Sequence, residues 1–264
     1  HRLSLHSLGN SGEEYNLIWE VTMDTPAHHW GDVYNGRIFV PGRKFVTLPN
    51  RVSRTFDQSS YSQCEKEWSF NETIEIYSLD NGKHIDSIEI LPILSKSRNE
   101  EFARFLNDCN DPIHLNDIQI LRPEHAKGGF FPGGNSGDML ISMREINTIA
   151  LIDQDSHDVK WSSSQFSAQH SPRITSDGTI LVFDNLASNR EFGKSRITEL
   201  DIATRKVVGI WEGTKAFHFE SREGGRLQIL GDRIFVQVSD NGSLFELSCS
   251  KRPISFECKK KLIL

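Results

Sequence analysis

The fold is decided by a stretch that reads GDMLISMREINTIALIDQDSHDVKW, from Gly137 to Trp161. It contains a turn, an apolar run, a second apolar run that ends in Asp153, another turn and a closing tryptophan. Short apolar runs separated by Gly, Asp and Asn are typical of antiparallel strands joined by tight turns. The pattern recurs as DGTILVFDN, beginning at Asp177, and as RITELD, ending at Asp201. The chain therefore repeats one small β unit.

The length of the repeat identifies the architecture. Equivalent strand positions are Ile152, Leu200 and Leu247, which are 48 and 47 residues apart, and Trp161 and Trp211 close two copies at the same place. Four-stranded blades of β-propellers have this length and this even spacing. We predict an all-β protein in which residues 1–264 form a single β-propeller domain. The visible blades span about 28–95, 113–162, 167–213 and 217–260, and a fifth blade is an alternative.

Two polar insertions interrupt the repeat, at about 43–70 and at about 96–112, and the second is predicted to hold a short helix at 99–107. Propellers are closed rings, and many are closed by pairing strands from both ends of the chain. We therefore expect residues 16–21 and 254–264 to complete one blade together.

Composition excludes two classes of partner. The net charge is −6, and the only run of basic residues is Lys259-Lys260-Lys261, so nucleic acid is not expected to bind. No apolar run approaches the ~18 residues that a membrane-spanning helix needs. We expect small-molecule partners and no membrane span.

Cysteine and glycosylation patterns favour an extracytoplasmic location, either periplasmic or secreted. Cys249 and Cys258 flank a short turn, which favours a disulfide across one hairpin, and elimination then pairs Cys64 with Cys109. Four free buried thiols are the alternative. Sequons at Asn71-Glu72-Thr73 and Asn241-Gly242-Ser243 fit a glycoprotein.

Histidines stand where each inner strand is expected to begin. They are His28 and His29 together, then His114, His170 and His218. The first strand of each blade lines the central channel of a propeller, so these side chains could converge there on one anion. Histidines that only bond neighbouring backbone are the alternative.

Arg144 follows an apolar strand, where an unpaired guanidinium is costly to bury. An oxyanion suits its planar fork, and a salt bridge to Glu145 or Asp117 is the alternative. A metal held by the channel histidines competes with the anion, but a cationic Arg144 opposes a dication. We expect no metal and no cofactor.

At these residues the chain resembles the bacterial arylsulfate sulfotransferase (ASST) family. The resemblance covers about 110–250 well and 16–45 weakly. The resemblance rests on five motifs: HLND at 114–117, ISMR at 141–144 with Asn147, FSAQH at 166–170, FDN at 183–185, and SR at 195–196. The resemblance implies a six-bladed propeller with its site in the central channel. It also implies transfer of a sulfuryl group from an aryl sulfate ester to a phenol, through a sulfated histidine and without a nucleotide donor.

The resemblance also implies residue roles. His170 would be the nucleophile, while Arg144 and His114 would hold the sulfuryl oxygens. Asn116 and Asn147 would support the substrate, as would the His28-His29 pair, of which we prefer His29. Ser171 departs from the family, which usually has an acidic residue after the nucleophile, and the chain is shorter than the bacterial enzymes.

Two other hypotheses stand beside the sulfotransferase. The first is a non-catalytic propeller that binds a ligand or protein partner, and the second is a hydrolase or metal-dependent lyase on the same scaffold. An enzyme predicts that His114, Arg144 and His170 meet within a few Å. A scaffold predicts that local partners occupy each of them.

Overall fold

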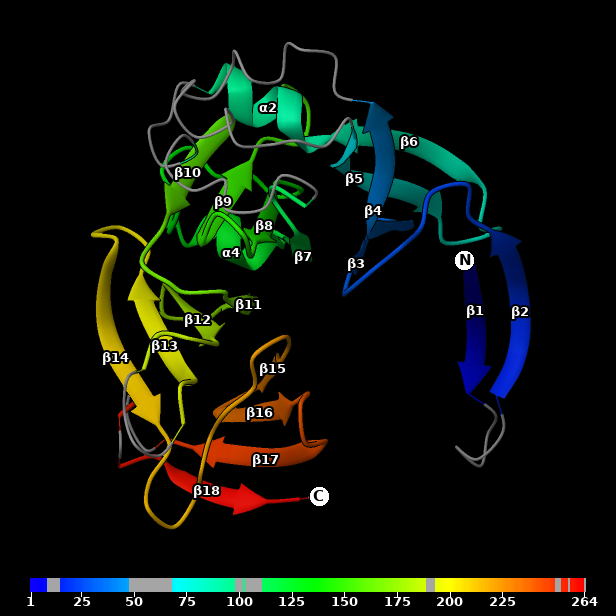
Figure 1. Ribbon diagram of the computed structural model, residues 1–264. Coiled ribbons are helices and arrows are strands. Elements are labelled where there is room, and N and C mark those ends of the chain that lie inside the picture. The colour runs from blue at the N-terminus through cyan, green and yellow to red at the C-terminus, as the bar shows by residue number, and fades with distance from the viewer. Residues whose placement is uncertain are drawn as a thin grey trace.

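The described part of the chain consists of four antiparallel four-stranded sheets and a separate two-stranded hairpin (Figure 1). The computed structural model describes residues 1–8, 15–47, 68–97, 102, 111–188, 193–249, 253–255 and 257–263. Each four-stranded sheet contains four consecutive strands, each paired with its neighbour in sequence. The all-β prediction is confirmed, and the four sheets coincide with the four predicted blades.

The elements have the following bounds. The hairpin contains β1 (Arg2–Leu8) and β2 (Tyr15–Thr22), and the first sheet contains β3 (Asp32–Tyr34), β4 (Arg37–Thr47), β5 (Trp68–Ser78) and β6 (His84–Glu89). The second sheet contains β7 (Leu115–Ile120), β8 (Met139–Met143), β9 (Thr148–Ile152) and β10 (Val159–Ser163). The third contains β11 (His170–Ile174), β12 (Thr179–Asp184), β13 (Arg196–Asp201) and β14 (Lys206–Glu212). The fourth contains β15 (Arg226–Leu230), β16 (Arg233–Val238), β17 (Ser243–Ser248) and β18 (Lys259–Leu262). Two short helices are α2 (Ile90–Lys96) and α4 (Pro123–Lys127).

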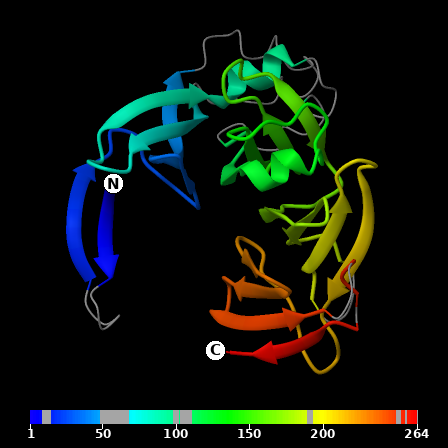
Figure 2. The same cartoon turned by 180° about the vertical axis from the view of Figure 1, so that it is seen from behind.

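The sheets follow one another around an open arc, with the hairpin at one end and the β15–β18 sheet at the other (Figures 1 and 2). The strands β3, β7, β11 and β15 are innermost, and β7 contacts β3 and β11 while β11 contacts β15. The beginnings of these four strands therefore meet around one central region. This arrangement positions the site described below.

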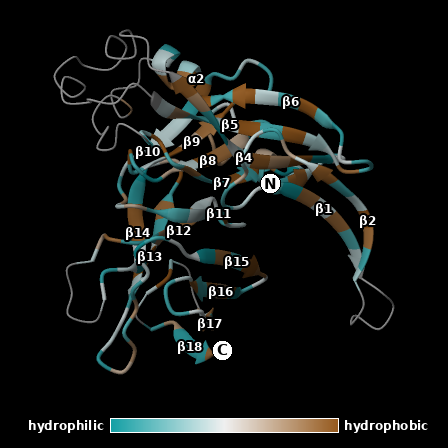
Figure 3. Cartoon of the chain, turned by 45° about the vertical axis from the view of Figure 1, so that its right-hand side comes forward, coloured by the Kyte–Doolittle hydropathy of each residue, from teal (hydrophilic) through white to brown (hydrophobic). Residues whose placement is uncertain are grey.

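The core lies between successive sheets, because the middle strands are covered on both faces. Every residue of β8, β9 and β12 is buried, which explains their continuous apolar runs. Phe183, Trp211, Phe219 and Phe245 pack edge-on between the third and fourth sheets. In contrast, hydrophobic and hydrophilic residues alternate along β1 and β2 (Figure 3), which is typical of strands with one exposed face.

The prediction that the two ends of the chain complete one blade is wrong. Strand β2 pairs with β1, and β18 pairs with β17. The hairpin instead docks on the first sheet, where the Trp19 indole N–H donates to the Leu79 carbonyl at 2.9 Å. At the other end, Leu262 lies opposite Phe245 and forms the outer edge of the fourth sheet.

The predicted insertions and disulfides have mixed outcomes. Residues 43–47 and 68–70 belong to β4 and β5, which form one long hairpin, so the first insertion is shorter than expected. A disulfide joins Cys249 and Cys258 at an S–S distance of 2.05 Å, as predicted. Cys64, Cys109 and most of the predicted helix at 99–107 lie outside the described residues.

The two sequons differ in their surroundings. Asn241 is exposed in the turn between β16 and β17, whereas Asn71 is buried in β5 and its amide donates to Glu89 at 2.9 Å. The burial of Asn71 leaves no room for a glycan there in the folded chain. Among the described helices, none is long and apolar enough to span a membrane.

Candidate functional site

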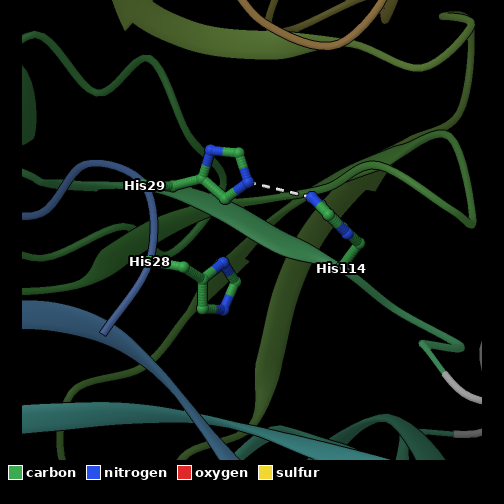
Figure 4. Close-up of side chains that lie close together, drawn as sticks. All are labelled: His28, His29 and His114. Carbon is green, nitrogen blue, oxygen red and sulfur yellow. Dashed lines mark hydrogen bonds between the residues drawn. The ribbon is translucent and has the colours of Figure 1, made fainter. Parts of the chain in front are cut away.

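Three of the four predicted inner-strand histidine positions converge. The His29 ring centroid lies 4.9 Å from that of His114 and 5.6 Å from that of His170. The His28 ring lies 5.1 Å from His29 and 5.8 Å from His114 (Figure 4). The fourth does not take part, because β15 begins only at Arg226. His218 lies in the connecting segment before that strand and is exposed.

The backbone at this cluster is strained in a consistent way. His29 and His114 have φ values of 59° and 52°, and Ala168 and Ser171, on either side of His170, have values of 54° and 51°. Residues other than glycine rarely adopt this left-handed conformation, which costs on the order of 1–3 kcal/mol each. Strand β11 also carries a register shift just after His170. Such irregularities re-aim side chains and are common beside functional sites.

The tautomer of His170 is fixed by Asn185. The Asn185 amide nitrogen donates to the carbonyls of Ser221 and Gly224, both at 2.7 Å, so its Oδ1 is left as an acceptor. That oxygen lies 2.9 Å from His170 Nδ1, which also lies 3.1 Å from the Ala168 carbonyl. Nδ1 therefore carries the hydrogen, and Nε2 carries the lone pair. His170 Nε2 is buried and, among the described residues, has no hydrogen-bond partner.

His170 is neutral at physiological pH. Burial, together with the nearby charge of Arg144, lowers the pKa of its imidazole to about 4, against the hydrogen bond that the ring donates to Asn185. His170 is only 3% exposed. A neutral imidazole with a bare, buried Nε2 is a nucleophile that needs no base to activate it.

Asn116 and Asn147 hold the backbone that leads into His170. The Asn116 amide donates to the Gln169 carbonyl at 2.7 Å, and Asn147 Oδ1 accepts from the Ala168 N–H at 2.7 Å. The Gln169 amide in turn donates to Ser142 Oγ and to the carbonyls of Met143 and Thr148, each at 3.1 Å. The second sheet thus clamps the start of β11.

The other motif residues hold Asn185 and its strand. Asp184 is buried and accepts from the Ser167 N–H at 2.7 Å and from Arg196 Nε at 3.0 Å. The Ser195 hydroxyl lies 2.9 Å from the Asn185 carbonyl. These contacts give the motif residues a positioning role around His170.

A second chain of contacts runs from His29 to a carboxylate. His29 Nε2 and His114 Nε2 are 2.9 Å apart (Figure 4), so one hydrogen lies between the two rings. His114 Nδ1 lies 2.6 Å from Asp111. Burial would raise the pKa of Asp111, but the His114 hydrogen bond and the charges of His114 and Arg43 lower it to about 2. The ionised carboxylate orients His114, while burial lowers the pKa of His29 to about 3.

Sequence reasoning missed three members of this network: Arg43, Glu72 and Asp111. Arg43 Nε lies 2.9 Å from Glu72 and 3.0 Å from His28 Nε2, and its Nη2 lies 2.7 Å from Asp111. Glu72 is fully buried, and burial raises its pKa well above the usual value. Arg43 faces Glu72 across the β4–β5 ladder, in a segment that the sequence presents as a polar insertion. Charged residues at facing positions of a strand pair were the available signal.

Arg144 is at the site but already has a partner. Its guanidinium forms a salt bridge with Glu145, which is the alternative that the sequence left open. Its backbone N–H donates to the His114 carbonyl at 3.0 Å, and its charge acts on the His170 ring.

The ring nitrogens of His28, His29 and His114 lie within 4.8 Å of one another, a grouping that could hold a metal ion. The Arg43 guanidinium, however, lies 3.0 Å from His28 Nε2 and 2.9 Å from His114 Nδ1. Burial, followed by the Arg43 charge, lowers the pKa of His28 to about 2. The same positive charge opposes a dication and suits an anion.

Comparison with known proteins gives a family and a fold. The family model described as Arylsulfotransferase (ASST) matches residues 6–254. No curated protein matches the chain.

Among solved structures, Sqt1 of Saccharomyces cerevisiae is similar in fold, with a TM-score of 0.50 and 11% identity over 98% of this chain and 67% of that one. A protein of unknown function from Bacteroides caccae has a TM-score of 0.45 and 11% identity over 88% and 82% of the two chains. At such identities a structural likeness concerns the fold alone.

Proposed function

The chain belongs to the arylsulfotransferase (ASST) family, and from this premise we propose that it transfers a sulfuryl group from an aryl sulfate ester to a phenol through a sulfated His170. The single observation that carries the proposal is His170 Nε2. This nitrogen is buried and lacks a partner among the described residues. It carries the lone pair because the hydrogen of the ring is on Nδ1, which donates it to Asn185 Oδ1 in a hydrogen bond.

In the first step, His170 Nε2 attacks the sulfur of the aryl sulfate. A bond forms between nitrogen and sulfur while the bond between sulfur and the aryl oxygen breaks, and the electron pair leaves on the phenolate. Nδ1 keeps its hydrogen, so the ring becomes cationic and the attached sulfonate balances its charge. The Asn185 oxygen, 2.9 Å from Nδ1, stabilises that positive ring.

The departing phenolate needs a proton. The His29–His114 pair, with Asp111 behind it at 2.6 Å, is placed to supply one. In the second step the same pair removes the proton of the acceptor phenol, whose oxygen then attacks the sulfur. The bond between nitrogen and sulfur breaks and its electron pair returns to Nε2. The two steps balance without a metal, an oxidant or a nucleotide.

Charge on the sulfuryl oxygens grows in both transition states. Arg144 and the N–H of the histidine pair are the donors beside His170, and one donor aimed at developing charge is commonly worth about 3–4 kcal/mol. Arg144 would share its guanidinium between Glu145 and the sulfuryl group. We further propose that the protein works outside the cytoplasm, which the disulfide of Cys249 and Cys258 supports.

The proposal is tested by incubating the protein with a chromogenic aryl sulfate alone and measuring its intact mass. We expect a gain of one sulfuryl group, which is lost when a phenol is added. His170→Ala should gain no mass and show no turnover, whereas His218→Ala, at the exposed histidine outside the site, should match the unaltered protein. Near-native turnover by His170→Ala would show that the covalent mechanism is wrong.

A further inference from the structure

Arg226 occupies the fourth blade's counterpart of the His170 position. It begins β15, as His170 begins β11, and the two strands lie side by side (Figures 1 and 2). The next residues along the two strands are joined, because the Leu227 N–H donates to Ser171 Oγ at 2.9 Å. Arg226 therefore stands at the level of the nucleophile.

The Arg226 guanidinium forms no direct ion pair with any described residue. Among the described residues, no hydrogen bond or ion pair engages its side chain, and the residue is only partly exposed. The charge of Asp117 acts on Arg226, but both oxygens of that carboxylate are bound by Arg173, at 2.8 and 3.0 Å. A half-buried guanidinium without a partner is costly, so this layer of the site carries one unbalanced positive charge.

Among the described residues, that guanidinium contacts an aromatic ring and no charged group. Its central carbon lies 3.9 Å from the centroid of Trp30. Trp30 directly follows His29 in the chain, and a parallel bridge pairs it with Asp117 on β7. The residue is 45% exposed, although the Arg226 guanidinium lies over one face of its ring.

An open indole and an unpaired guanidinium together recognise an aromatic anion. The indole offers a flat apolar surface for a ring, and the guanidinium fork suits a carboxylate. We propose that Trp30 and Arg226 form a binding subsite for a phenol that carries a carboxylate, beside the residues of sulfuryl transfer. The assignment of that phenol as the acceptor rests on the proposed function; its binding does not.

Binding is measured by titration calorimetry with two matched probes, 4-hydroxyphenylacetate and its neutral amide. The unaltered protein should bind the acid more tightly than the amide. A charge-assisted hydrogen bond contributes about 1.5–3 kcal/mol, so Arg226→Gln should weaken binding of the acid about ten- to hundredfold and leave the amide unchanged. Arg226→Lys should keep part of the preference. Arg233→Gln, an exposed arginine of the same sheet, is the control and should keep all of it.

Kinetics separate this inference from the proposed function. With the acid as acceptor, Arg226→Gln should raise KM and leave kcat nearly unchanged. Equal losses of kcat with acid and amide would overturn the subsite, because Arg226 would then act on the sulfuryl group. Equal binding of the two probes by the unaltered protein would also overturn it, even with active transfer. Selective binding of the acid without any turnover of an aryl sulfate would sustain the subsite and refute the proposed function.

Discussion

Replacing His170 should make folding stability less sensitive to acid. The buried imidazole has a pKa of about 4 in the folded chain, against a usual value of 6.5. The unfolded chain therefore binds a proton at higher pH than the folded chain does, so stability falls as pH drops below about 6.5 and levels off below about 4. Between pH 7.5 and 4.5 this single group should remove about 2.5 kcal/mol.

The assay is urea unfolding of the unaltered protein and of His170→Gln at both pH values. The loss of unfolding free energy between pH 7.5 and 4.5 should be smaller in the variant by about 2.5 kcal/mol. His218→Gln, at an exposed histidine, should lose as much as the unaltered protein. Equal losses in the unaltered protein and His170→Gln would refute a neutral, buried His170, and with it the argument for a ready nucleophile.

Two further predictions concern the groups around His170. Arg144→Gln should lower kcat about 10²–10³-fold yet leave some sulfated protein detectable by mass, because Arg144 stabilises charge and forms no bond; a complete loss of labelling would contradict this. Asn185→Ser should slow transfer by about fivefold, since one orienting hydrogen bond is worth roughly 1 kcal/mol. It should also lower the melting temperature, because two buried carbonyls lose their donor, and an unchanged kcat for the folded protein would leave Asn185 a purely structural role.

The sheets were predictable because each one has a recognisable pattern in the sequence. Turn residues precede continuous apolar runs, and these runs are continuous because neighbouring sheets cover both faces of strands such as β8 and β12. The pairing of the strands at the two ends of the chain was not predictable. The last strand reads KKKL at 259–262, a composition that fits any solvent-facing edge. The chain just before it is held by buried Ile254 and by the disulfide.

The histidines of the site were predictable from their repeated place in the blades, and the resemblance supplied their roles. Arg43 and Glu72 were not, because they lie on a long hairpin whose two strands are separated in sequence by a polar stretch. Arg226 was hidden for another reason. His218, eight residues before Arg226, matches the histidine pattern of the other blade starts. However, Phe217 and Phe219 pack inward on either side of His218, which leaves its side chain in solvent.

The distribution of unsatisfied polar atoms separates a site from a satisfied core. Elsewhere in the described chain, a buried charge such as that of Asp138 is matched by donors. In contrast, His170 Nε2, His28 Nδ1, and the side-chain oxygens of Asn116 and Gln169 are buried without a partner. All four residues belong to the histidine cluster or to the clamp that holds it, whereas two further atoms of this kind, Asn71 Oδ1 and Ser163 Oγ, lie outside both. Because each such atom costs on the order of 1–3 kcal/mol, their concentration at one place, together with the left-handed backbone at His29 and His114, is the pattern expected of a site shaped for a ligand.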